Sequence, residues 1–368
     1  MKRIFLAVLC SISLMQAFSQ NLLTFTSQRP PQLDVASYKS VAIGNITGPL
    51  GSPTELSMDV TDALSSRLFG SQTLEVVDKG TLDKVLGDQR FNDLQVIDAK
   101  TTQELNRKLG NSLLITGRLQ SSSLEQKLIY EDQSIVVNGC SRQYYYQVKG
   151  SAVIQLKIFD VKTGRLIFND AISRPVDKKT KTSCEIPMKL DVGEIGRQAA
   201  KDLSEDIAAL ITPSEYQQLM KVENPGLFKG PFKKLDEAVS LMQAKSFDAG
   251  LAILKGYTED QAIKSKFKAP AYYNYGLGLL CAGQLDEAKT NFEKSLGLNS
   301  SYAPTISQLL QLIETEKQAA QKMARLEEDR KKAREQQLAE AATPKEQPAK
   351  TGAVKPAAAK PKAKAKGF

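Results

Sequence analysis

The stretch LLITGRL, residues 113–119, decides the fold of this chain. Its apolar residues run together without alternation, which is typical of a strand buried on both faces of a sheet. Upstream, SVAIGNI at residues 40–46 has the same character, and Thr54 and Glu55 predict the start of a helix between the two. A further strand is expected at residues 73–78. This alternation of strands and helices predicts an α/β domain.

Beyond residue 119 the apolar residues alternate with polar ones, so residues 124–172 predict long strands with a turn at residues 162–164. The helices are expected at residues 54–69, 81–88, 101–109 and 192–210, and in the first of them the residues placed on one apolar face are Leu56, Val60, Ala63, Leu64, Leu68 and Phe69. We therefore predict a mixed sheet flanked by helices over residues 38–215, preceded by an extended lead-in at residues 20–37.

The order of these segments resembles the curli production transport (CsgG) family and its relatives, which include lipoprotein activators of penicillin-binding proteins and the amino-terminal domain of the Tol-Pal β-propeller protein. The segments that carry the resemblance are residues 40–43, 56–69, 74–78, 82–86, 108–110, 113–117 and 158–164, together with Gln89. The family's pore-forming members add two amphipathic hairpins to each subunit. Here residues 124–148 lack a clean apolar row and residues 175–189 are short and charged, which argues against that role.

A second unit is expected over residues 232–313, after a linker at residues 216–231. Residues 271–292 resemble a tetratricopeptide repeat, in which Gly276, Gly283, Ala288 and Phe292 take the small, turn, small and bulky positions. The pattern recurs 38 residues earlier at Ala238, Lys245, Gly250 and Leu254, with an insertion expected at residues 264–267. The resemblance implies an all-α helical repeat unit capped by a helix from residue 305 to about residue 314.

Repeats of this kind form concave surfaces that bind peptides. Tyr272, Tyr273 and Tyr275 are therefore candidate contacts for an envelope or secreted partner protein, although some of them must instead fill the repeat core. The alternative is that so small an array only supports its neighbour.

The amino end predicts export. Lys2 and Arg3, an apolar run and then Ala17 and Ser19 form a three-part signal, so residues 1–19 are expected to be removed. Two alternatives are an uncleaved anchor and lipidation at Cys10. In an oxidising periplasm Cys140 and Cys184 are candidates for a disulfide; the alternative is three buried free thiols, with Cys281 the third.

The net charge of +9 lies mostly outside the expected folded units. The tail, placed at residues 342–368, carries +6 and the signal +2, which leaves the body nearly neutral and argues against nucleic-acid binding. A charged helix is expected at residues 314–341, solvated rather than part of a coiled coil. The lysine-, alanine- and proline-rich tail should be disordered, with anionic envelope polymers or lipid as weak partners or no partner at all.

The sequence contains no histidine, which excludes Ser-His and Cys-His nucleophile systems and histidine zinc sites. We expect no catalytic, metal-binding or cofactor-binding residues. The leading hypothesis is a non-catalytic exported adaptor in envelope assembly, secretion or cell-wall regulation. We expect it in the periplasm, either free or peripheral to the outer membrane, and either alone or as a homo-oligomer. The alternative is an oligomeric outer-membrane secretion-channel component, and a carboxylate-based cell-wall enzyme comes third.

Overall fold

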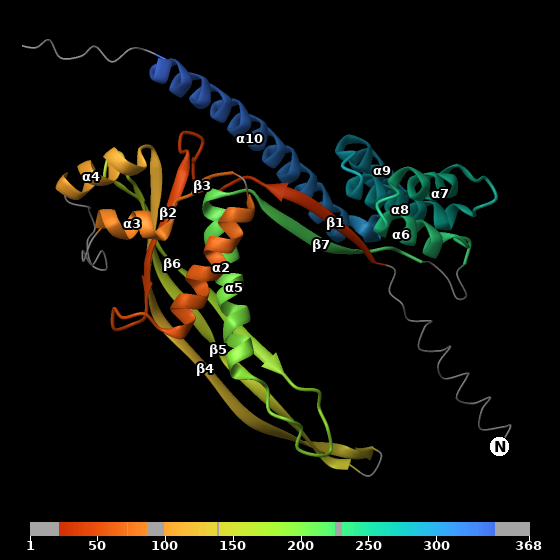
Figure 1. The fold of residues 1–368 in the computed structure, drawn as a ribbon. Helices are drawn as coiled ribbons and strands as arrows, with labels where there is room; N and C mark the ends of the chain where they lie inside the picture. The colour runs from red at the N-terminus through yellow and green to blue at the C-terminus, as the bar shows by residue number, and fades with distance from the viewer. Residues whose placement is uncertain (1–21, 72, 87–98, 138–139, 225–229, 343–368) are drawn as a thin grey trace, which may run out of the picture.

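A computed structural model of the protein describes residues 22–71, 73–86, 99–137, 140–224 and 230–342. A mixed α/β domain is followed by a helical region (Figure 1), which confirms the predicted fold class for these parts of the chain. The predicted signal peptide and nearly all of the predicted tail lie outside the described residues. Among those residues, no helix is both long and apolar enough to cross a membrane.

In the described residues, the main sheet has five strands in the order β3-β2-β4-β5-β6. β2 pairs in parallel with β3 and β4, whereas β4, β5 and β6 follow one another antiparallel. The strands are β2 (Ser40–Thr47), β3 (Glu75–Val76), β4 (Ser112–Val137), β5 (Cys140–Asp160) and β6 (Leu166–Lys179). The parallel half is formed by the segments in which strands and helices were predicted to alternate. The antiparallel half is formed by the segments in which apolar and polar residues alternate.

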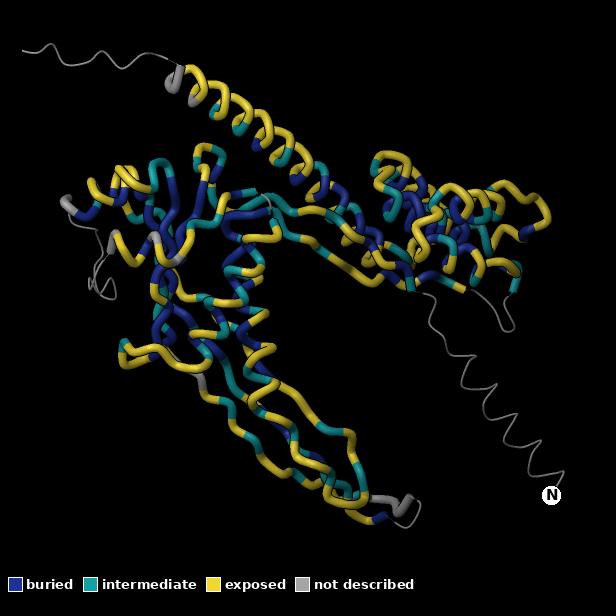
Figure 2. The backbone as a smooth tube through the Cα atoms, viewed as in Figure 1, coloured by how far each residue is buried: buried dark blue, intermediate teal, exposed yellow. Residues whose placement is uncertain are grey.

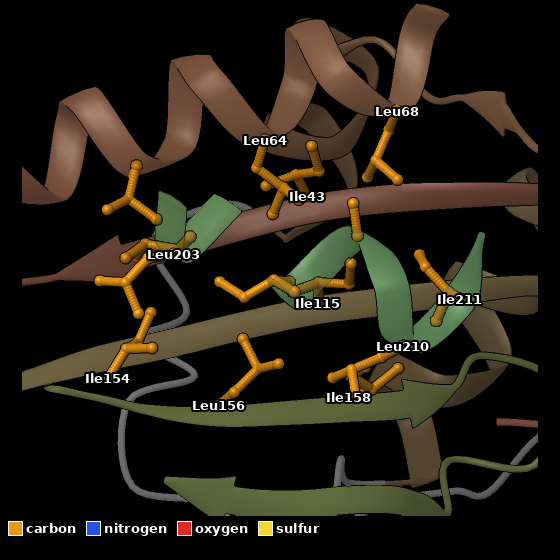
Figure 3. Packing of buried hydrophobic residues seen from close by; sticks show 14 of the residues in the cluster. Ile43, Leu64, Leu68, Ile115, Ile154, Leu156, Ile158, Leu203, Leu210 and Ile211 are labelled. Carbon is orange, nitrogen blue, oxygen red and sulfur yellow. The ribbon is translucent and has the colours of Figure 1, made fainter. Parts of the chain in front are cut away.

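Helices cover both faces of the sheet near its parallel half. α2 (Glu55–Ser71) and α5 (Val192–Ile211) pack on one face, and α3 (Lys79–Leu86) and α4 (Ala99–Leu109) on the other. In β4, Leu113 and Ile115 face the first pair while Leu114 faces the second (Figure 3 shows the first cluster). The strand is buried on both sides, and this explains its uninterrupted apolar run.

One residue of α2 departs from its expected position. Val60, Leu64 and Leu68 are buried, but Phe69 is 79 % exposed. Nine residues separate Phe69 from Val60, and about 100° of rotation per residue places the two on opposite sides of a helix. An aromatic ring therefore lies on the surface at the end of α2.

The expected lead-in and linker pair with each other. β1 (Leu22–Arg29) and β7 (Ser214–Lys221) form an antiparallel two-stranded ribbon along their whole length. Leu23 and Phe25 from β1, with Met220 from β7, insert into the core of the helical region. The ribbon thus joins the flanks of the α/β domain to the helices.

The helical region contains two consecutive hairpins and a long last helix. The hairpins are α6 (Leu235–Gln243) with α7 (Phe247–Glu259), and α8 (Lys268–Cys281) with α9 (Leu285–Leu298), separated by a 3-10 turn at Ser265–Phe267. Their corresponding turn residues, Lys245 and Gly283, both have positive φ, at 61° and 77°. A Cβ on Gly276 would lie 2.7 Å from the Phe292 ring, so the α8–α9 contact requires glycine there.

The last helix, α10 (Ala303–Ala342), continues without a break across the boundary expected near residue 314. Ile306 and Ile313 pack in the helical region, whereas Leu326 packs in the core of the α/β domain. The part of α10 beyond residue 314 therefore has a partly buried side, although its charged sequence predicts a solvated helix. Small and polar residues on its buried face, including Glu316 and Ala319, conceal the apolar period.

Candidate interaction surfaces

A strand finger extends from the main sheet and presents a projecting surface of the α/β domain (Figure 1). It consists of residues 124–132 of β4, 141–149 of β5 and 175–184 at and beyond the end of β6. β4 and β5 stay paired along the finger, and Tyr144 exchanges two backbone hydrogen bonds with Ser183, of 2.7 and 3.0 Å. Figure 2 shows that most of it is exposed or half-buried. The finger is therefore a three-stranded element whose buried apolar residues, such as Val148 and Val176, belong to the core of the α/β domain.

A disulfide between Cys140 and Cys184 lies near the distal end of the finger, with Cα atoms 5.7 Å apart. It ties the chain that follows β6 to the beginning of β5. Cys281 has a free thiol in α8, and burial raises its pKa to about 12. A thiol with so high a pKa is a poor nucleophile near neutral pH.

One face of the finger carries apolar and aromatic side chains. Leu128 lies opposite Tyr146 and Tyr130 opposite Tyr144, so all four point to the same side of the sheet. Leu128 is 41 % and Tyr130 57 % exposed. We call Leu128, Tyr130, Tyr144 and Tyr146 the aromatic face. In the sequence, this face is indicated only by several tyrosines within a segment whose apolar residues alternate. None of these tyrosines is among the predicted contact residues.

The chain that returns from the finger to α5 adds apolar surface on the same side. Ile186 is 59 % and Met188 89 % exposed. Gln126 precedes Leu128 by two residues and therefore points to the same side of the sheet. It donates a 3.0 Å hydrogen bond to the Leu190 carbonyl, which places the returning chain over that side. Tyrosine and methionine are enriched in protein interfaces, and this surface has their combination.

The opposite face of the finger is polar and internally paired. Tyr145 donates to Glu131 at 3.0 Å, and Gln147 donates to Asp177 at 2.6 Å. The Glu131 carboxylate and burial raise the pKa of Tyr145. On the aromatic face, the Arg142 guanidinium lies 4.4 Å from the centroid of the Tyr130 ring and pairs with Asp132 at 2.6 Å. The two faces therefore differ in their aromatic content rather than in whether their polar groups have partners.

The three tyrosines predicted as partner contacts occupy different environments in α8. Tyr273 is 5 % exposed and packs against Phe292 and Tyr302, with ring centroids 6.0 and 5.2 Å away. It therefore belongs to the core, as expected for some of the three. Tyr272 and Tyr275 are half-buried, with the Lys294 ammonium 5.6 Å from the Tyr272 ring. Their role as contacts stays a prediction.

The chain's own ribbon covers one side of the helical region. β1 lies against α6, α8 and α10, on the unit predicted to bind a peptide. The Asn274 side chain accepts from the Glu223 backbone NH at 2.9 Å and donates to its carbonyl at 2.7 Å. Gln243 likewise donates to the Leu22 carbonyl at 2.9 Å. These side-chain amides therefore hold the protein's own extended backbone.

Within the described ranges, no three Cys, Asp or Glu side chains gather in a way that would hold a metal ion. The acidic residues that are ion-paired include surface pairs such as Asp206 with Arg174 and Glu194 with Arg197.

The fold and its surfaces define a mixed α/β domain with a projecting strand finger, joined to a helical unit by a ribbon and a long helix. Residues 27–197, which contain the sheet and the finger, match the family described as curli production assembly/transport component CsgG. No curated protein matches the chain.

Several solved structures have a distant likeness to this chain. The PelC dodecamer from Paraburkholderia phytofirmans has 9 % identity and a TM-score of 0.27, over 52 % of this chain and 99 % of that one. Lipoprotein GNA1162 from Neisseria meningitidis has 10 % identity and a TM-score of 0.25, over 46 % and 98 %. A putative neuraminyllactose-binding hemagglutinin homolog from Helicobacter pylori has 15 % identity and a TM-score of 0.29, over 48 % and 84 %. At these TM-scores the neighbours bear on neither the partners nor the activity of this chain.

Proposed function

We propose that this protein is an exported, non-catalytic component of the cell envelope that binds other proteins during envelope assembly, secretion or cell-wall regulation. The observation that carries the proposal is the aromatic face of the strand finger, exposed on a frame held by three paired strands and a disulfide. A preformed apolar surface loses little conformational entropy on binding, so it suits the capture of a partner.

The match of residues 27–197 to a transport-component family supports an envelope role, and the predicted signal supports location in the periplasm. The helical hairpins share four corresponding positions 38 residues apart, which supports their relation to tetratricopeptide repeats. In this proposal the helical unit mainly braces the ribbon and α10, since the ribbon occupies one side of it. Tyr272 and Tyr275 offer it a secondary contact surface.

Site-specific photo-crosslinking tests the proposal. A photoreactive residue at position 130, on the aromatic face, should yield a discrete crosslinked envelope protein. The matched control is position 127 on the opposite face of the same strand, where Lys127 is exposed and paired with Glu125 at 3.0 Å. Equal crosslinking from both positions would mean that the finger has no specific partner surface, and crosslinking only from position 272 would move the site to α8.

The second candidate is an oligomeric secretion-channel component, favoured by the description of the matched family. Fractionation separates the two. Release of the tagged protein from membranes by high salt, or recovery in the periplasm, supports the adaptor. Retention until detergent is added, together with ring-shaped particles in the extract, supports the channel component.

A further inference from the structure

A cleft lies between the second half of α10 and the edge of the main sheet. It has a volume of about 580 Å³ and separates α10 from the segment before β2, the end of α2 and the edge strand β3. Its walls include Lys39, Phe69, Glu75, Arg330 and Arg334. The volume falls in the range of small-molecule sites, about 300–1,000 Å³.

The charges around this cleft do not balance. Lys39, Arg330 and Arg334 contribute three positive charges, and Glu75 is the one carboxylate in its lining. Arg330 and Arg334 are four residues apart in α10, which places them on the same side of the helix. Like charges at that spacing repel, and a net excess of two positive charges favours an anion of charge near −2.

The Arg330 guanidinium shows the imbalance most directly. Its Nε and Nη2 atoms are covered by protein, yet neither finds a hydrogen-bond acceptor among the residues that the structure describes. Burial and the neighbouring Arg334 charge both lower its pKa. Glu327 on the same helix offsets part of this charge, but the two covered nitrogen atoms still lack acceptors, so an anion in the adjacent cleft would be stabilised by the guanidinium without touching them. Lys39 and Arg334 are exposed and supply accessible donors.

The cleft also has an apolar part. Phe69 is 79 % exposed on its wall, and Leu74, Val76 and Ala333 lie beside it. A bare inorganic anion would leave this surface unused, whereas a ligand that joins a phosphate to a ring or a chain would cover it. An exposed aromatic ring beside paired arginines is a combination that recognises both parts of such a ligand.

We propose that this cleft binds a phosphomonoester attached to an apolar or ring-bearing group. A phosphomonoester carries about −1.5 to −2 charge at neutral pH, which matches the excess charge of the lining. The same chemistry occurs in a water-soluble sugar phosphate and in a phosphatidate headgroup, and the experiment below separates these two sources.

The test is calorimetric titration of the full chain with glucose 6-phosphate and with inorganic phosphate at matched ionic strength. The Arg334→Gln variant should bind glucose 6-phosphate about tenfold more weakly, as expected for the loss of a charge-assisted hydrogen bond. The control Lys331→Gln removes the same charge from an exposed residue of the same helix outside the cleft lining and should bind as the wild type does. Equal weakening in both variants would overturn the proposal.

Two further variants test the assignment of each wall. Glu75→Gln should tighten binding because it removes the opposing charge. Phe69→Ala should abolish the preference for glucose 6-phosphate over inorganic phosphate while leaving inorganic phosphate binding unchanged. The proposal would also be overturned if neither glucose 6-phosphate nor inorganic phosphate bound and if the wild type bound phosphatidylcholine vesicles containing phosphatidate no better than Arg334→Gln does. Binding to those vesicles alone, lost in Arg334→Gln, would identify the headgroup as the source.

Discussion

Lys245 follows α6 in a left-handed conformation, with φ of 61°, where the corresponding position of the next hairpin has Gly283. It is the one non-glycine residue with positive φ in the part of the chain that the structure describes. A side chain in this conformation costs about 1 kcal/mol relative to glycine. The turn persists because backbone hydrogen bonds close it, among them those from Lys245 to Met242 and from Ser246 to Leu241.

We expect Lys245→Gly to raise the free energy of unfolding by about 1 kcal/mol, because it removes this strain. Urea denaturation of both proteins measures the change. The matched control is Gly283→Lys, which should lower stability by a similar amount. A loss of stability in Lys245→Gly would show that the lysine side chain contributes more than its backbone costs.

The buried Tyr273 and the half-buried Tyr302 predict a loss of stability at alkaline pH. Burial raises the pKa of Tyr273 to about 12 and that of Tyr302 to about 12, from 10.0 for the free side chain. Between these values the unfolded chain releases protons that the folded chain keeps, so stability present below pH 10 falls as the pH rises through 12. Thermal melting from pH 9 to 12 should show a smaller fall in Tyr273→Phe than in the wild type. An unchanged slope would mean that Tyr273 ionises normally in the folded protein.

At the scale of elements, the disulfide holds the chain that follows β6 against β5. The bond spans 44 residues in sequence, and closing a loop of that order stabilises a protein by roughly 2–4 kcal/mol in the chain-entropy description. We expect the Cys140→Ser, Cys184→Ser double variant to lose stability within that range and to be cut faster by protease after residue 180. Cys281→Ser provides a comparison in which the bond remains; equal protease sensitivity in both would exclude a tethering role.

The regular elements of the α/β domain were predictable because their apolar residues repeat with clear periods. Residues 40–46, 113–119 and 192–210 coincide closely with β2, the start of β4, and α5. The ribbon was missed because β7, SEYQQLMK, alternates weakly and pairs with a strand nearly the whole α/β domain away. Tyr130 and Tyr144 were not recognised as one surface because only the strand register brings them together. Arg330 and Phe69 belong to segments whose proximity depends on the path of α10.

At the scale of the molecule, α10 and the ribbon hold the two units together. Arg29 of β1 and Glu316 of α10 form an ion pair of 2.6 Å, in which the carboxylate side chain is only 7 % exposed. The Arg29 guanidinium also lies 4.5 Å from the centroid of the Tyr216 ring. This one side chain therefore contacts both β7 of the ribbon and the long helix.

Arg29→Ala should lower the free energy of unfolding by about 3 kcal/mol, because it leaves the Glu316 carboxylate buried without its partner. Chemical denaturation measures the loss. Lys317→Ala is the matched control: its ion pair with Asp286 has the same 2.6 Å distance, but the aspartate is 88 % exposed, so little change in the free energy of unfolding is expected. Similar losses in both variants would show that burial of Glu316 does not matter.

The pairing of β1 with β7 makes the α/β domain an insertion between two strands that serve the helices. A fragment that begins at residue 232 would lack Leu23, Phe25 and Met220 and would leave their apolar pockets open to water. The smallest autonomous version of the helical unit is consequently discontinuous in sequence, with residues 22–29 and 214–222 connected by a short turn in place of the whole sheet. Separating the two units therefore requires two cuts in the chain, one after β1 and one before β7, rather than a single cut.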